Sequence, residues 1–106
     1  MVRRGDVWLA ALDPTVGSEI QKTRPCLIIS PPEIHDHLRT VIVAPMTSGS
    51  RPAGFRVSVS FQGVNGLTLL EQSRALDKRR LVKRLGQVPE DVLTETLRTL
   101  RELYEE

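Results

Sequence analysis

The sequence is poor in cysteine and in long apolar runs, and each scarcity excludes a class of protein. Cys26 is the only cysteine among 106 residues, so an internal disulfide is excluded and a reducing cytoplasm is the expected location. The N-terminus lacks an apolar signal core, and no apolar run approaches the length needed to span a membrane. We therefore expect a cytoplasmic protein without membrane contacts. Because Cys26 lies inside an apolar run, we interpret it as a small core residue rather than a nucleophile.

Aromatic side chains and metal-ligating clusters are scarce as well. The chain holds one Trp, one Tyr and two Phe, most of which fall in segments expected to be buried, so few remain to stack on nucleobases. The nearest approach to a metal cluster is His35-Asp36-His37, in a loop or short helical turn after Pro31-Pro32-Glu33. We interpret both histidines as exposed loop residues, with an acid/base pair or a metal site as the alternatives. We predict no metal and no cofactor.

Short apolar strands separated by turn residues dominate the first 75 residues. The predicted strands are Asp6–Leu12, Pro25–Ser30, Thr40–Ala44, Phe55–Phe61 and Leu67–Glu71, with a last short one at Lys83–Val88. The run Gly63-Val64-Asn65-Gly66 is a hairpin-like turn signal ahead of the fifth strand. Many short strands in one small domain must cover their edges, so the pattern predicts a single, mainly β domain closed as a compact barrel.

The C-terminus changes to a helical period. Pro89 is well suited to a first helical position, and two acidic residues follow it, where the helix dipole favours negative charge. Apolar residues then recur at spacings of three and four, namely Leu93, Leu97, Leu100 and Tyr104, with Leu103 beside them. We expect one helix over about residues 89–105, packed on the barrel.

Charge is distributed unevenly along the chain. Residues 1–88 carry 13 basic and 7 acidic groups, whereas residues 89–106 carry 2 basic and 6 acidic groups. A basic body suits a polyanionic partner, although the excess is modest. Five of the cations lie within seven residues, at Lys78-Arg79-Arg80 and Lys83-Arg84. This cluster is either a nucleic-acid footprint or an ordinary solvated face.

The segment Leu12 to Ser30 carries the most informative polar residues. Arg24 precedes Pro25 at the start of a buried strand, so a rigid element holds its backbone while its guanidinium can reach solvent. A guanidinium offers five donors in a fixed fork and stays charged at working pH, which suits phosphate recognition. The alternative is an ordinary surface ion pair.

Two further groups of polar residues accompany Arg24. Thr47 and Ser48 follow the third strand and present hydroxyls at its mouth, unless they only bond the local backbone of a turn. Glu19, Gln21 and Lys22 lie on the long loop before Arg24, a position typical of ligand-binding loops. Glu19 is a candidate general base, but it can equally bond a base edge or hold Lys22.

Beyond these residues, the chain resembles the MazF/PemK (Kid-like) toxin endoribonucleases of type II toxin–antitoxin systems over about residues 3–88. The matching pieces are Arg4-Gly5-Asp6-Val7-Trp8, Asp13-Pro14-Thr15, Gly17-Ser18-Glu19, Arg24-Pro25, Ala44-Pro45-Met46-Thr47-Ser48, Glu71-Gln72, Ala75 to Leu81 and Gly86. The resemblance implies an SH3-like small β-barrel of the CcdB/PemK type with appended helices. It places the arginine of RP and the threonine of PxTS together in an active site, so Arg24 and Thr47 become the expected catalytic residues.

The resemblance also makes the loop after the first strand part of an RNA groove, with Gln21, Lys22 and Ser48 as expected RNA contacts. One departure concerns an acidic residue that some members pair with an arginine two positions earlier. Here the acid position matches Glu71, but the arginine position matches Leu69. This weakens an acid/base role for Glu71 and makes Gln72 an expected polar RNA contact.

The implied function is a metal-independent, sequence-preferring endoribonuclease, an mRNA interferase that cleaves single-stranded RNA to 2′,3′-cyclic phosphate and 5′-hydroxyl ends. The implied partners are a second copy, in a homodimer, and a cognate acidic, MazE-like antitoxin. Because fold does not fix function, a non-enzymatic CcdB-like gyrase poison and an inactive RNA-binding module are the alternatives.

Overall fold

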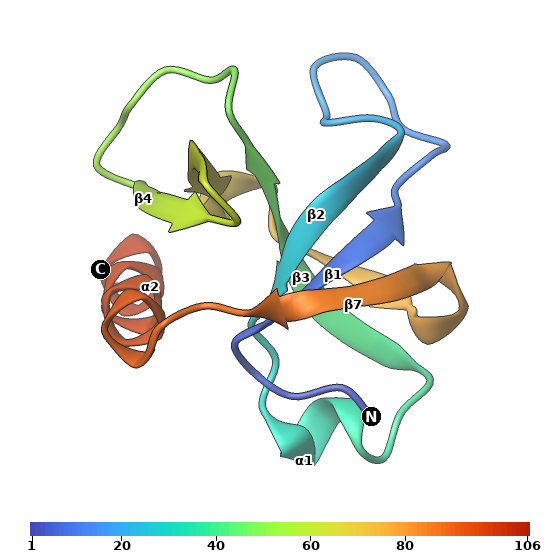
Figure 1. The fold of residues 1–106 in the computed structure, drawn as a ribbon. Helices are drawn as coiled ribbons and strands as arrows, with labels where there is room; N and C mark the ends of the chain where they lie inside the picture. Colours follow the sequence, from blue (N-terminus) through green and yellow to red (C-terminus); the bar gives the residue numbers. More distant parts are fainter.

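Seven strands and a long helix make up most of the computed structural model, which describes residues 1–106 (Figure 1). The strands are β1 (Asp6–Ala11), β2 (Thr23–Ile28), β3 (Thr40–Thr47), β4 (Arg56–Phe61), β5 (Val64–Leu69), β6 (Arg74–Asp77) and β7 (Leu81–Gln87). The helices are α1 (Pro32–His35) and α2 (Glu90–Leu103), with short 3₁₀ turns at Leu70–Gln72 and Lys78–Arg80. No helix of the chain is both long and apolar enough to cross a bilayer.

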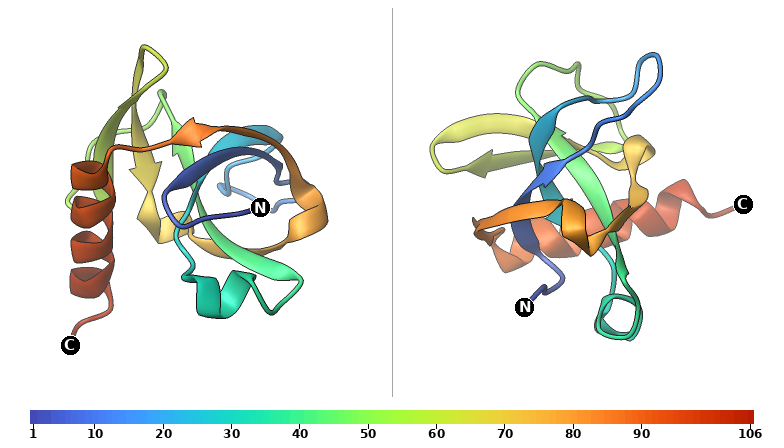
Figure 2. Two further views of the ribbon diagram at one scale, coloured as in Figure 1. Left: turned by 60° about the horizontal axis from the view of Figure 1, so that its bottom comes forward. Right: turned by 90° about the vertical axis from the view of Figure 1, so that its right-hand side faces the viewer.

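The sheet runs in the order β4-β5-β3-β2-β1-β7, with β6 paired to β3, and every pairing is antiparallel. It curls into a half-barrel whose two edge strands, β4 and β7, are not paired with each other (Figures 1 and 2). The expectation of a small, mainly β barrel with a C-terminal helix is therefore confirmed in the form of a half-barrel.

Strand β3 is longer than the predicted Thr40–Ala44 because it continues through Pro45 to Thr47. Its first half pairs with β6, its middle pairs with β2, and its end turns to β5 through the pairs Met46↔Thr68 and Thr47↔Leu67. Pro45 has no N–H to donate to the ladder, yet it stays paired within the sheet, opposite Cys26. The end of β3 thus lies where the two halves of the sheet meet.

Apolar residues of these strands form two buried clusters. One contains Val7, Leu27, Ile29, Ala44, Met46, Val57, Val59, Leu70 and Val88. The other contains Ala10, Leu12, Cys26, Ile28, Val41, Val43 and Leu76. Cys26 is fully buried, and burial raises the pKa of its thiol to about 12, so its interpretation as a core residue is confirmed.

Helix α2 packs on the first cluster through Val92, Leu93 and Leu100. It begins one residue later than expected, with Pro89 as the residue that precedes it. The predicted stripe is wrong at its end, because Leu103 and Tyr104 are exposed where the helix extends past the sheet (Figure 2). Threonines take part of the buried face instead: the hydroxyls of Thr96 and Thr99 each donate to a backbone carbonyl one turn earlier, which makes their burial inexpensive.

The hairpin between β4 and β5 turns two residues earlier than predicted. Gln62 and Gly63 form a two-residue loop with φ of 51° and 78°, the left-handed pair of a type I′ turn. Val64, Asn65 and Gly66 belong to β5 rather than to the turn. The predicted fifth strand, Leu67–Glu71, therefore begins three residues and ends two residues earlier, as Val64–Leu69. Its last two predicted residues belong to the 3₁₀ turn that leads into β6, a strand that the sequence pattern missed.

The interpretation of both histidines as exposed is wrong for His35. His35 ends the short helix α1 and is 1% exposed, with Nδ1 3.0 Å from the hydroxyl of Ser30, whereas His37 is exposed. The ammonium of Lys78 donates to the His35 carbonyl and fixes this corner from outside. Burial of one ring and exposure of the other removes the proposed acid/base pairing of the two histidines.

Candidate functional site

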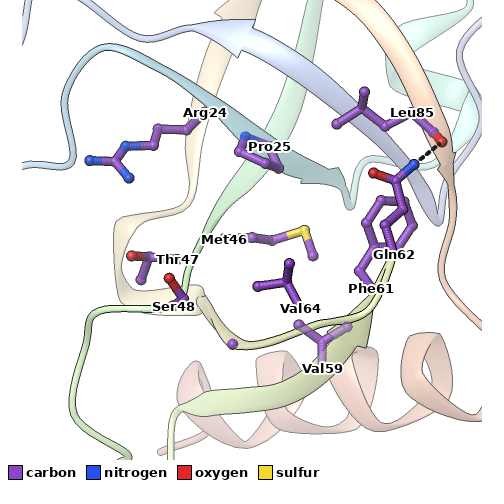
Figure 3. A pocket seen from close by; sticks show the side chains of 11 residues that line it. Arg24, Pro25, Met46, Thr47, Ser48, Val59, Phe61, Gln62, Val64 and Leu85 are labelled. Carbon is purple, nitrogen blue, oxygen red and sulfur yellow. Dashed lines mark hydrogen bonds between the residues drawn. The ribbon is translucent and has the colours of Figure 1, made fainter.

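The site lies where β2 begins and β3 ends. The β2–β3 pairing ends at Cys26↔Pro45, and Arg24 and Thr47 each lie two residues from this pair, on β2 and β3. A pocket of about 250 Å³ opens beside them (Figure 3). It is lined by Arg24, Pro25, Met46, Thr47, Ser48, Val59, Phe61, Gln62, Val64, Gly66 and Leu85. Three residues singled out from the sequence, Arg24, Thr47 and Ser48, therefore meet at one end of a pocket.

The guanidinium of Arg24 is anchored but not neutralised. Its Nε donates to the Gln21 carbonyl at 3.2 Å, which fixes the direction of the side chain. No carboxylate lies within ion-pair distance of Arg24, and its two terminal nitrogens have no hydrogen-bond partner in the protein. The surface ion pair considered as the alternative is therefore wrong. A half-buried guanidinium with free terminal N–H groups is equipped to bind two oxygens of an anion.

The Thr47 hydroxyl bonds the local backbone of a turn and can still bind a ligand, so both interpretations of it hold. Its Oγ1 accepts a hydrogen bond from the Gly49 N–H at 3.2 Å, which is the local turn interaction. A hydroxyl has a second lone pair and its own proton, so the O–H remains able to donate to a ligand. Ser48 is exposed next to it. The hydrogen bond in the turn therefore orients the Thr47 hydroxyl and leaves its proton available to a ligand.

Gly66 of β5 lies directly against the backbone of Thr47. A Cβ added to Gly66 would lie 2.6 Å from the Thr47 carbonyl oxygen and 3.2 Å from its carbon. These are backbone atoms, which cannot rotate aside as the tip of a side chain can. The absence of a side chain at Gly66 is thus a condition for the observed position of Thr47.

The loop residues and Gln72 surround a second, smaller pocket of about 180 Å³. Glu19 and Gln72 line it together with Pro45, and the Ile20 N–H donates to the Gln72 side-chain oxygen at 2.8 Å. Side chains alternate along a strand, so Pro45 and Thr47 share a face of β3. Pro45, which lines the second pocket, therefore lies on the same face of β3 as Thr47. Glu19 and Gln72 do not line the first pocket.

Two more loop residues stand close to Arg24 in sequence. The carbonyl of Gln21 holds Arg24, and both Gln21 and Lys22 are exposed. Lys22 has a φ of 71° and turns the chain into β2, while its carbonyl accepts from the Leu12 N–H. Glu19 is exposed too, and its carboxylate accepts from the Val16 N–H. The loop is thus held by backbone and side-chain hydrogen bonds, while the side chains of Gln21 and Lys22 are exposed.

Glu71 has an arginine partner that sequence reasoning missed. Leu69 occupies the position where the resemblance leads one to expect arginine, and it is 1% exposed. Arg56 is its cross-strand neighbour in β4, and Arg56 binds the Glu71 carboxylate through Nε at 2.9 Å and through a terminal nitrogen. Only the register of β4 against β5 reveals this ion pair, because Arg56 and Glu71 are 15 residues apart.

Most of the basic cluster binds the protein itself. Arg84 pairs with the buried Asp6 at 3.1 Å, Arg80 donates to the Ala11 and Asp13 carbonyls, and Lys78 holds α1. Arg79 is exposed but bonds Asp77, and this bond holds the pKa of the Asp77 carboxyl below its usual value. The Arg84–Asp6 pair joins β7 to β1, and Arg80 joins the turn before β7 to the end of β1, so these residues have a structural role.

The arrangement has the chemistry of an anion site. No group of three or more His, Cys, Asp or Glu side chains lies close enough together to hold a metal ion. Arg24, Thr47 and Ser48 instead offer a cation and hydroxyls at one edge of a pocket, and the Arg56–Glu71 pair joins β4 to the 3₁₀ turn after β5. The fold and the site define a small β half-barrel protein with an arginine–hydroxyl site beside a pocket.

Comparison with known proteins assigns the family. A profile described as PemK-like, MazF-like toxin of type II toxin–antitoxin system matches residues 3–104. The chain is 43% identical to the endoribonuclease PemK of Escherichia coli in an alignment 102 positions long, which covers 91% of this chain and 77% of that protein. It therefore belongs to the PemK/MazF toxin family of type II toxin–antitoxin systems, as the resemblance indicated.

Solved structures agree with this assignment. MazF (Form-I) from Deinococcus radiodurans superposes with a TM-score of 0.85 at 30% identity, over 96% of this chain and 94% of that one. MazF in the MazE–MazF (Form-II) structure from the same organism superposes with a TM-score of 0.77 at 27% identity, over 96% and 93% of the two chains.

Proposed function

We propose that this protein is a metal-independent, sequence-preferring endoribonuclease toxin that cleaves single-stranded RNA, such as mRNA, in the cytoplasm. One observation carries the proposal: Arg24, which no carboxylate neutralises, lines the same pocket as Thr47. Membership of the PemK/MazF family and 43% identity to an endoribonuclease support it.

RNA carries its own nucleophile, the 2′-hydroxyl, so the protein need only position the reacting groups and stabilise the charge that develops on the phosphate. The 2′-hydroxyl oxygen attacks the adjacent phosphorus, the P–O5′ bond breaks, and the products are a 2′,3′-cyclic phosphate and a 5′-hydroxyl. Arg24 binds the non-bridging phosphoryl oxygens and stabilises the charge that develops there, while the Thr47 hydroxyl donates to the same group. The proton lost by the 2′-hydroxyl goes to a base, and the leaving O5′ receives a proton.

The remaining polar residues bind the RNA strand on either side of the phosphate. Glu19 serves as the base or as an RNA contact from the loop beside the second pocket. Gln21, Lys22 and Ser48 are exposed around Arg24, and the free amide N–H groups of Gln72 face the second pocket. Together they form a path for single-stranded RNA across the ends of β2 and β3.

Two partners complete the proposal. A single half-barrel offers little length of groove, so two copies related by a two-fold axis form the active species. A cognate acidic antitoxin neutralises the toxin by laying a flexible, carboxylate-rich segment over Arg24 and the loop at residues 19–22. The MazE–MazF structure from D. radiodurans is a precedent for such a partner.

Incubation of the purified protein with a long RNA in EDTA tests the function. We expect fragments whose 5′ ends accept phosphate from polynucleotide kinase without phosphatase treatment. A metal requirement or 5′-phosphate ends would contradict the mechanism. RNA binding without cleavage would support an RNA-binding module instead, and inhibition of DNA gyrase supercoiling by a protein that leaves RNA intact would support a gyrase poison.

A further inference from the structure

The pocket beside Arg24 is larger and more apolar than phosphate binding requires. Arg24, Thr47 and Ser48 occupy one end of it, and the walls beyond are apolar (Figure 3). These walls comprise Pro25, Met46, Val59, Phe61, Val64 and Leu85. A dry apolar cavity of about 150 Å³ is enough to bind benzene, so about 250 Å³ accommodates one planar heteroaromatic ring. The proposed cleavage chemistry makes no use of this space.

The two edge strands of the half-barrel, β4 and β7, contact each other beside the pocket. Phe61, the last residue of β4, packs against Gly86 of β7, where an added Cβ would lie 3.2 Å from the ring. Gly86 has a φ of 152° and so accommodates both the backbone conformation and the ring. Val64, at the lip, remains 58% exposed. Covering this apolar lip with a ring is favourable, because it removes apolar surface from water.

Gln62 gives the far end of the pocket a polar edge. Its side-chain Nε2 donates to the Leu85 carbonyl at 3.0 Å, which determines the orientation of the amide (Figure 3). The Oε1 atom and one N–H of the amide remain without a partner in the protein. An acceptor beside a donor matches the N6 and N7 positions of adenine, the base that a glutamine amide reads with two hydrogen bonds.

We propose that this pocket binds one unstacked base of the substrate, next to the phosphate held by Arg24, and that Gln62 selects adenine there. The inference rests on the proposed function and specifies the substrate of the same site. Apolar walls remove the ring from water, Arg24 holds the phosphate at one end, and the Gln62 amide reads the base edge at the other. Loss of two such hydrogen bonds lowers discrimination on the order of 10- to 100-fold.

A binding experiment tests the pocket without requiring cleavage. The probes are hexamers of adenosine, cytidine or uridine whose 2′-hydroxyls are methylated, so that no strand can be cut. Titration of the ¹³C-methyl-labelled protein should shift the methyl resonances of Met46, Val64 and Leu85, and the adenosine hexamer should bind at least tenfold more tightly than the others. Binding that leaves these methyl groups unmoved, or equal binding of all three hexamers, would overturn the proposal.

Two variants with controls complete the test. Gln62→Met keeps the length of the side chain but removes its hydrogen bonds, so the adenosine preference should fall at least tenfold. Val64→Glu places a carboxylate at the lip, whereas Asn65→Glu adds the same charge at the next, exposed residue of β5. We expect Val64→Glu to weaken adenosine binding at least tenfold more than Asn65→Glu does; equal effects would mean that only net charge matters.

The outcomes separate this inference from the proposed function. Pocket binding with adenosine preference, in a protein that leaves unmodified RNA intact, would refute the cleavage proposal alone. RNA cleavage with the pocket methyl groups unmoved would refute the base pocket alone. If nuclear Overhauser contacts show the methyl groups covered by a second copy of the chain in the free protein, the pocket is a protein interface and the proposal fails.

Discussion

Replacement of Gly66 by alanine perturbs the site through one atom, and the structure gives its consequence. The new Cβ would lie 2.6 Å from the Thr47 carbonyl oxygen, whereas ordinary contacts begin near 3.4 Å, so Thr47 must retreat by about 0.8 Å. Both groups belong to paired strands, β5 and β3, so the movement shifts the end of β3 as a unit. Gly66→Ala therefore displaces the Thr47 hydroxyl relative to Arg24.

Two effects of different size follow. Overpacking of this kind typically lowers the free energy of unfolding by about 1–3 kcal/mol. A displacement near 1 Å of a group that positions the reacting atoms costs on the order of 100-fold in rate. Because the second effect is large and the first leaves most proteins of this size folded, we expect a folded protein that cleaves RNA about 100-fold more slowly.

Gly54 supplies the matched control. Nothing lies within 4 Å of a Cβ built on Gly54, and its φ is not in the left-handed region. Gly54→Ala should leave the cleavage rate unchanged and alter stability by less than about 1 kcal/mol. The assay is single-turnover RNA cleavage, with urea unfolding of each variant to measure stability. A Gly66→Ala protein with the parental rate would refute the argument that close approach positions Thr47.

Three further expectations concern the whole protein. Light scattering at micromolar concentration should give a homodimer, twice the chain mass of 11.9 kDa, and a monomer mass would contradict the two-fold groove. The small protein encoded beside this one should inhibit cleavage in competition with RNA and bind more weakly as salt rises, since rim charges contribute; tight binding without inhibition would rule out occlusion of the groove. Cys26 is fully buried with a pKa of about 12, so a thiol reagent at pH 8 should react with it only as fast as the protein opens, and rapid labelling of the native protein would show that its strand is accessible.

The sequence predicted most strands because alternation and β-branched runs are local signals. It placed β1 correctly to within one residue, and it found the helix α2 from its period. It misplaced the β4–β5 turn, because the left-handed φ of Gln62 is imposed by the pairing of the two strands and is not indicated by the residue type. It also misjudged His35, since burial of a polar ring depends on the hydroxyl of Ser30, which approaches it only in the folded chain.

The candidate site divides in the same way. Arg24 and Thr47 were identifiable because each lies at the end of a predicted strand and matches a family motif. Gln62 and Arg56 were not, because their importance arises from contacts with Leu85 and Glu71, which lie far from them in the sequence. A pocket wall assembled from β2, β3, β4, β5 and β7 has no signature within any one segment.

The central claim is that Arg24 stabilises the reacting phosphate, and a comparison of three proteins tests it most directly. Single-turnover cleavage of one RNA in EDTA is measured for the parent, Arg24→Ala and Arg24→Lys. Because the Arg24 terminal nitrogens bind no protein group, Arg24→Ala should lie within about 1 kcal/mol of parental stability. We predict that Arg24→Ala abolishes cleavage and that Arg24→Lys restores only a small part of it, since an ammonium supplies the charge without the two-pronged geometry. Near-parental cleavage by a folded Arg24→Ala protein would contradict the account.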